Sequence, residues 1–162
     1  MATHHEQAVE MSLLIIDRST DQRILTLARD IAFTQQSQIG QMRGWLDVWG
    51  LPATGLDLPM TWMGHTTTGL MPGMATRDEL ASLQQATGTE ADRQFLKLMM
   101  RHHEGALPMA QALLDRSDNE PVSQLARSIL TSQQAEIELM QSMLEQVPGE
   151  AASVAPATPE AN

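Results

Sequence analysis

The sequence predicts an all-α fold, a four-helix bundle built from two copies of one helical hairpin. The first reason is an internal repeat: residues 4–46 align with residues 102–144 without a gap, with 17 identities in 43 positions. Two segments that merely share a composition would not stay aligned without a gap over such a length, so we attribute the match to duplication. The second reason is that only five of the 162 residues are aromatic. Leu, Ile, Ala and Met must therefore fill the core, and this mixture favours helices.

The first copy contains two predicted helices, over about residues 3–18 and about residues 21–48. The polar residues between them, Ser-Thr-Asp at positions 19–21, are of the kind that cap a helix N-terminus. Farther along the chain, Thr76 and Glu79 have the spacing of a capping box and predict one more short helix.

The second copy contains a predicted helix from Thr89, its expected N-cap with Asp92 three positions on, to about residue 116. Pro108 lies inside this helix and should kink it. The residues Ser-Asp-Asn at positions 117–119 form the next turn. Pro121 falls in the first turn of the last helix, where its missing N–H costs nothing.

These elements predict one duplicated domain over residues 1–146. Its parts are repeat 1 (about 1–48), a linker rich in Gly, Pro, Thr and Met (49–88) and repeat 2 (about 89–146). The Pro/Ala/Glu-rich remainder, 147–162, is predicted to be a disordered tail.

Composition excludes several classes of function. The formal net charge of −10 makes nucleic acid an improbable partner, because an acidic chain repels phosphate. The absence of cysteine excludes disulfides, zinc–thiolate sites and thiol catalysis. No apolar run approaches the ~20 residues that span a bilayer. No signal peptide is visible either, and we expect that a targeting segment has been removed.

A stripe of soft donors runs along the first helix of the second copy. Met99, His102, Ala106 and Met109 follow one another at helical spacing, so they share a face on which the small Ala leaves room. His103 is turned by about 100° from that face and pairs by spacing with Met99. Thioether and imidazole together suit soft and borderline metals, above all Cu(I) and Ag(I).

The first copy repeats this stripe with His4 and Met11, and it repeats the second imidazole with His5. Met42 and Met140, which are further candidate thioether ligands, occupy equivalent positions near the end of the second helix of each copy. The repeat therefore predicts two pseudo-equivalent His/Met sites, made unequal by Pro108, and leaves open whether the copies share one site.

The linker holds a second group of candidate ligands. Loops have little packing need for Met, yet two Met-x-x-Met units occur there, and a His follows the first of them. The candidate metal ligands in this segment are Met60, Met63, His65, Met71 and Met74.

Each of these features also has a purely structural interpretation. Methionine commonly fills gaps in helical cores, and the linker could fold back over the end of the bundle. A buried imidazole could simply be satisfied by a carbonyl or carboxylate. Glu6 and Glu104 could orient an imidazole or could be solvated. No nucleophile–base pair and no Glu-x-x-His motif is present, so catalysis is not predicted.

The sequence resembles the domain of unknown function 305 family over residues 1–146. The motifs that carry the resemblance are Met71-Pro-Gly-Met74, Phe95-Leu96-x-x-Met99-Met100-x-His102-His103-Glu104-Gly105-Ala106-x-x-Met109-Ala110 and Gln133-Gln134-x-Glu136-Ile137-x-x-Met140. The family is bacterial and mostly exported, with a ferritin-like bundle. The resemblance implies copper or silver binding through the His/Met positions by analogy. Pro108 departs from the pattern, because a helix former is usual there.

Together these observations predict a non-enzymatic Cu(I)-binding protein, with silver as a second metal, that acts as a sink, carrier or resistance factor in the periplasm or outside the cell. Self-association and a copper-handling partner protein are left open. The alternatives are a metal-dependent enzyme on the same bundle and a helical interaction domain without metal.

Overall fold

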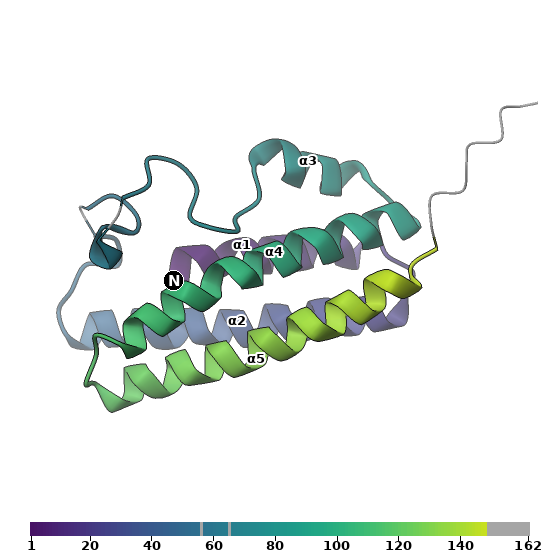
Figure 1. Cartoon of the computed structure of the whole chain (residues 1–162). Helices are drawn as coiled ribbons and strands as arrows, with labels where there is room; N and C mark the ends of the chain where they lie inside the picture. The colour runs from purple at the N-terminus through teal and green to yellow at the C-terminus, as the bar shows by residue number, and fades with distance from the viewer. Residues whose placement is uncertain (56, 65, 149–162) are drawn as a thin grey trace, which may run out of the picture.

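The computed structural model describes residues 1–55, 57–64 and 66–148 (Figure 1). This part of the chain contains helices and loops and no strand, which confirms the predicted all-α fold. Most of the predicted tail, residues 149–162, lies outside the described residues. The elements are α1 (Ala2–Ile16), α2 (Gln22–Val48), the 3-10 turn η1 (Thr61–Met63), α3 (Arg77–Gln85), α4 (Gly88–Leu114) and α5 (Glu120–Gln146).

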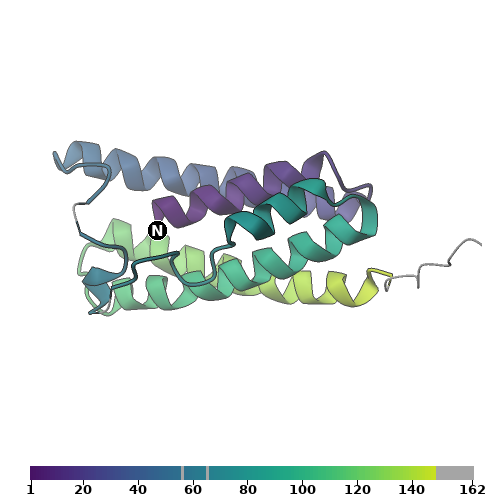
Figure 2. The ribbon, with the colours of Figure 1, turned by 90° about the horizontal axis from the view of Figure 1, so that it is seen from above.

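The four long helices form a bundle of two hairpins. Helix α1 packs chiefly along α2, and α4 packs chiefly along α5. The two hairpins meet through α1 and α4, and the short α3 lies outside the bundle over these two helices (Figure 2). The junction between α1 and α4 is therefore covered by the linker that joins the two copies.

Most of the predicted helix ends are found in the structure. Asp21 caps α2, Asn119 caps α5, and Thr76 and Glu79 form the predicted capping box of α3. The predicted cap at Thr89 is wrong, because α4 begins one residue earlier and Thr87 is its N-cap residue. The Gly88 N–H donates to the carbonyl of residue 18 at 3.0 Å, and this bond ties the start of α4 to the end of α1.

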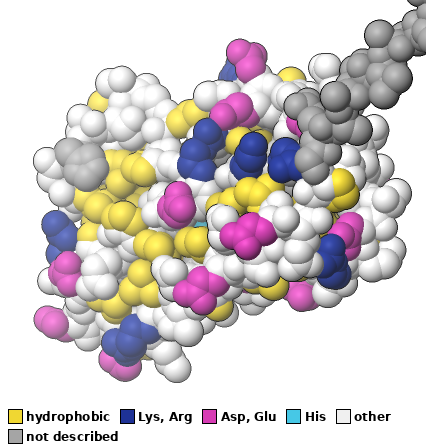
Figure 3. Space-filling view, turned by 45° about the vertical axis from the view of Figure 1, so that its right-hand side comes forward, with side chains coloured by type: hydrophobic (Ala, Val, Ile, Leu, Met, Phe, Trp, Pro, Cys, Tyr) yellow, Lys and Arg dark blue, Asp and Glu magenta, His cyan; other side chains and the backbone are white. Residues whose placement is uncertain are grey.

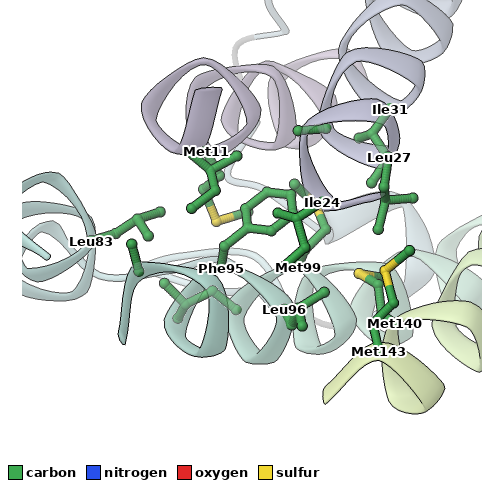
Figure 4. Close-up of a cluster of buried hydrophobic side chains, with 14 of the residues drawn as sticks. Met11, Ile24, Leu27, Ile31, Leu83, Phe95, Leu96, Met99, Met140 and Met143 are labelled. Carbon is green, nitrogen blue, oxygen red and sulfur yellow. The ribbon is translucent and has the colours of Figure 1, made fainter. Parts of the chain in front are cut away.

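The main core lies between the hairpins, toward the end of the bundle at which α4 begins (Figure 4). Phe95 has no exposed surface, and Met11, Met99 and Ile24 surround it. Burying a side chain of this size contributes about 1.5–3 kcal/mol. Helix α4 continues through Pro108, whose side chain is exposed.

The surface carries scattered charges of both signs together with apolar side chains (Figure 3). Several large exposed apolar side chains come from the end of α2 and the linker, namely Val48, Trp49, Leu51, Leu58, Trp62 and Leu70. None of the described helices is long and apolar enough to cross a membrane.

Candidate metal site

The histidine pairs of the two copies meet at the junction of α1 and α4. His4 and His5 on α1 and His102 and His103 on α4 have no exposed surface. The ring centroids of His4 and His102 lie 3.8 Å apart, with the ring planes tilted by 32°. Within each copy the two ring centroids are 6.5 Å and 6.1 Å apart. The histidines of the two predicted stripes therefore form one cluster of four imidazoles, whereas Met11 and Met109 belong to two different groups of buried side chains.

Hydrogen bonds fix the proton position on three of these rings. His4 Nε2 lies 2.9 Å from the Pro72 carbonyl oxygen, and His102 Nε2 lies 2.8 Å from the His4 carbonyl oxygen. His103 Nε2 lies 2.7 Å from Glu136 Oε2. A carbonyl or carboxylate oxygen accepts, so each Nε2 carries the proton and donates it. The lone pair of each of these rings is then on Nδ1.

The remaining ring nitrogens are buried without a hydrogen-bond partner among the described residues. They are the Nδ1 atoms of His4, His102 and His103 and both nitrogens of His5. A bare, desolvated imidazole lone pair beside an anchored N–H is the arrangement that metal-ligating histidines have.

Burial keeps His4, His5 and His102 neutral. It lowers the pKa of His4 to about 4, of His5 to about 3 and of His102 to about 2, and charge repulsion between neighbouring imidazoles lowers these values further. Metal binding requires deprotonated imidazole. His4, His5 and His102 are therefore in the form that binds a metal at neutral pH.

Residues 71–75 of the linker, which we call the strap, lie directly over the imidazole cluster. The Gln7 side chain holds the strap by two hydrogen bonds, from Nε2 to the Ala75 oxygen at 2.9 Å and from the Ala75 N–H to Oε1 at 2.6 Å. Gly73, at φ +80°, passes so close to Gly105 on α4 that a Cβ on either residue would overlap backbone atoms. The strap therefore shields the imidazoles from solvent.

The core methionines belong mainly to the packing of the bundle. Met11, Met99 and Met140 are fully buried among apolar side chains (Figure 4). Met99 precedes His102 by three residues, a rise of about 4.5 Å, whereas Met109 follows it by about 10.5 Å. Met99 is therefore the nearer thioether to that imidazole along the helix.

The linker methionines gather around Met109. Met60 is buried against Met109 and Ala106, and Met63 and Met71 pack on the same cluster. This is the folding back that the structural interpretation of the linker predicted, and it also brings several thioethers together. Of the other candidates, Met74 is half-buried in the strap, and His65 lies outside the described residues. Met42 is also half-buried. Together with Met109, Trp45, Trp49 and Trp62 it lines a cavity of about 330 Å³.

The carboxylate that supports an imidazole is not one of those considered from the sequence. Glu6 pairs with Arg43 at the surface, and Glu104 is exposed. Glu136 takes this role for His103 instead. Within residues 1–55, 57–64 and 66–148, no three His, Asp or Glu side chains converge to hold one ion by themselves.

Four buried imidazoles, with unpartnered ring nitrogens, define this protein as a helical bundle with a histidine cluster at the junction of its two hairpins. The chain belongs to the family described as Domain of unknown function (DUF305), which it matches over residues 1–144. The resemblance noted from the sequence is thereby confirmed.

Solved structures share the fold over nearly the whole chain. A DUF305 protein from Streptomyces coelicolor, described as a candidate secreted protein, is 44% identical, with 90% of this chain and 88% of that chain covered and a TM-score of 0.86. A DUF305 fragment from Deinococcus radiodurans is 36% identical, with 90% and 91% covered and a TM-score of 0.76.

Structures of the protein CopM in metal-bound forms are also similar. The Cu(I)-bound form is 26% identical, with 92% of this chain and 93% of that chain covered and a TM-score of 0.68. The Cu(II)-bound form is 28% identical, with 90% and 91% covered and a TM-score of 0.72. Among curated proteins, the uncharacterized protein L153 of Acanthamoeba polyphaga mimivirus is 45% identical over 47 residues, which are 29% of this chain and only 31% of that protein.

Proposed function

We propose that this protein binds copper, chiefly as Cu(I), with Ag(I) as a second ion, and that it does so without catalysing a reaction. The observation that carries the proposal is the set of bare Nδ1 atoms on His4, His102 and His103, each on a ring anchored through Nε2. A neutral imidazole held in this way is ready to donate to a metal.

The donor set favours a soft or borderline ion. The chain has no cysteine, so imidazole nitrogen and thioether sulfur are the soft donors it offers. Since His, Asp and Glu of the described part do not form a three-ligand site alone, an ion at the cluster would combine imidazoles with a thioether such as that of Met99. The likeness to CopM in its Cu(I)-bound and Cu(II)-bound forms supports copper as the ion.

A sink or carrier outside the cytosol fits this chemistry, because thioethers remain reduced where thiols would oxidise. The candidate secreted relative from Streptomyces coelicolor supports a periplasmic or extracellular location. The methionines around Met109 form a second candidate soft-metal cluster, in which Met60 and Met109 are buried and Met63 and Met71 are partly buried.

The test is a titration of the protein with Cu(I) in competition with a chromophoric chelator. The wild type should withdraw Cu(I) from the chelator. The pair of substitutions His4→Gln and His102→Gln should weaken binding at least about 10-fold, the range seen when a metal loses an imidazole or its support. Gln retains a polar group in the buried cluster, and circular dichroism would verify the fold.

The matched control is Met100→Leu, which changes a half-buried methionine next to Met99 that is not among the candidate ligands. Its affinity should equal that of the wild type. A wild type that leaves the chelator fully loaded would refute the proposal, as would His variants that compete as well as the wild type.

A further inference from the structure

The duplication places a carboxylate in one copy where the other has an amide. At the offset of 98 residues, Glu136 on α5 corresponds to Gln38 on α2, and His103 on α4 corresponds to His5 on α1. Both hairpins therefore aim the same helix position at the second imidazole of the pair. Comparing the two copies therefore shows how an imidazole is held with a carboxylate at this position in one copy and with an amide there in the other.

The two imidazoles are held differently. His103, with no exposed surface, lies 2.7 Å from Glu136, whose side chain is 20% exposed. His5 is equally buried, but neither of its nitrogens reaches a hydrogen-bond partner in the described part of the chain, and the Gln38 oxygen is also unpartnered. Gln38 lies near enough to oppose the lowering of the His5 pKa as a hydrogen-bond partner would, yet the two side chains do not have the geometry of a hydrogen bond.

No nearby amide replaces the missing partner. Gln35 and Gln133, one turn before these positions, are buried, and within the described residues their side-chain oxygen and nitrogen atoms have no partner. The tautomer and ring orientation of His103 are therefore fixed by its hydrogen bond to Glu136, whereas no hydrogen bond from the described residues fixes those of His5.

A carboxylate behind an imidazole does two things for a bound metal. It holds the proton on the far nitrogen, so that the other nitrogen presents its lone pair, and it raises the basicity of that lone pair. A neutral amide oxygen accepts more weakly and adds no charge. The same ring therefore donates better in the second copy than in the first.

We infer that Glu136 is a positioning residue that makes His103 the stronger imidazole donor, so that the second copy dominates metal binding and the first copy, with Gln38, is the weaker half. This inference rests on the proposed metal-binding function. It predicts which half of the duplicated cluster sets the affinity, and the residue that decides it.

The experiment exchanges the two residues. Glu136→Gln should weaken Cu(I) binding about 10-fold to 100-fold, which is the usual effect of losing such a support. Gln38→Glu should strengthen binding, and the variant with both changes should regain much of the lost affinity. Each variant is measured by chelator competition, with urea unfolding to compare stabilities.

A second readout separates positioning from stability. In metal-free protein, the ¹⁵N chemical shifts of the His103 ring should show one fixed tautomer with the proton on Nε2. In Glu136→Gln they should move toward the average of two tautomers, while in Gln38→Glu the His5 ring should become fixed.

The outcomes are distinct. A wild type that binds no copper would refute the proposed function. A wild type that binds copper, together with a Glu136→Gln variant of unchanged affinity and unchanged His103 shifts, would overturn only the role of Glu136. If Glu136→Gln does not fold, Gln38→Glu decides, because a His5 ring that stays averaged and an unchanged affinity would overturn the inference.

Discussion

The strap over the imidazoles depends on the absence of a side chain at position 105. A Cβ on Gly105 would overlap the Pro72 carbonyl oxygen and would lie 2.5 Å from the Pro72 carbonyl carbon and 2.8 Å from Gly73 Cα. All three are backbone atoms, so no side chain can rotate away to relieve the overlap. Gly105→Ala must therefore lift the strap from α4.

The cost follows from the bonds that the strap makes. Lifting it breaks the bond between His4 and Pro72 and the two bonds between Gln7 and Ala75. Each such bond contributes about 1 kcal/mol net, which makes the loss about 3 kcal/mol. Replacing Gly by Ala within a helix returns about 1 kcal/mol. We expect the free energy of unfolding to fall by about 2 kcal/mol.

Urea unfolding followed by circular dichroism measures this change, and Gly44→Ala is the matched control. Gly44 is an exposed residue of α2, and no described atom beyond its own helical surroundings lies within 4 Å of a Cβ built there. That substitution should raise stability by up to about 1 kcal/mol. If Gly105→Ala proves as stable as Gly44→Ala, the strap is not held as we describe.

Three further predictions concern pH and packing. The folded-state pKa values of His4, His5 and His102 are lowered to about 4, 3 and 2, so the unfolded chain takes up protons before the folded protein does as the pH falls below 6.5. The free energy of unfolding should therefore drop by at most about 1.4 kcal/mol per histidine and pH unit. Equal urea midpoints at pH 7 and pH 5 would contradict this. The Arg partner of Glu79 lowers the pKa of this carboxyl from 4.5 to about 2, so its contribution is complete above pH 4.5 and lost toward pH 2. Glu79→Gln should flatten that part of the acid profile and, because the pair is largely exposed, cost less than about 1 kcal/mol at pH 7. Phe95→Ala should cost about 3–5 kcal/mol in urea unfolding, and a loss below about 1 kcal/mol would show that the core repacks around the gap.

The helices could be predicted because their signals are local. The repeat, the polar turns and the capping residues placed the first helix at about 3–18, and α1 covers Ala2–Ile16. The capping box at Thr76 is a contact within one turn, so sequence spacing suffices to find it. The prediction that Thr89 caps α4 was wrong because the start of α4 is held by a hydrogen bond to the end of α1, which is distant in sequence.

The candidate site could be predicted only in part, because its decisive contacts cross between elements. Helical spacing identified the four histidines but not that His4 would lie against His102. Gln7 gave no signal, since a glutamine on a helix face is ordinarily solvated. The motif that includes Glu136 was visible, yet only the packing of α5 against α4 shows that it reaches His103. The sequence offered one indication of the role of Glu136, namely that the first copy has Gln38 at the equivalent position.

The differences between the two copies follow from the topology of the duplication. Two duplicated hairpins are joined by a single linker, and this linker can cross their junction only once. At the crossing, equivalent positions must differ: Gln7 binds the strap, and its counterpart Gly105 makes room for it. Because the strap contacts His4 in the first copy, the two copies are already unequal. The presence of Gln38 in the first copy where the second has Glu136 can therefore increase the difference without disturbing two otherwise equal sites. We therefore propose one shared cluster with a stronger and a weaker half in preference to two equal sites.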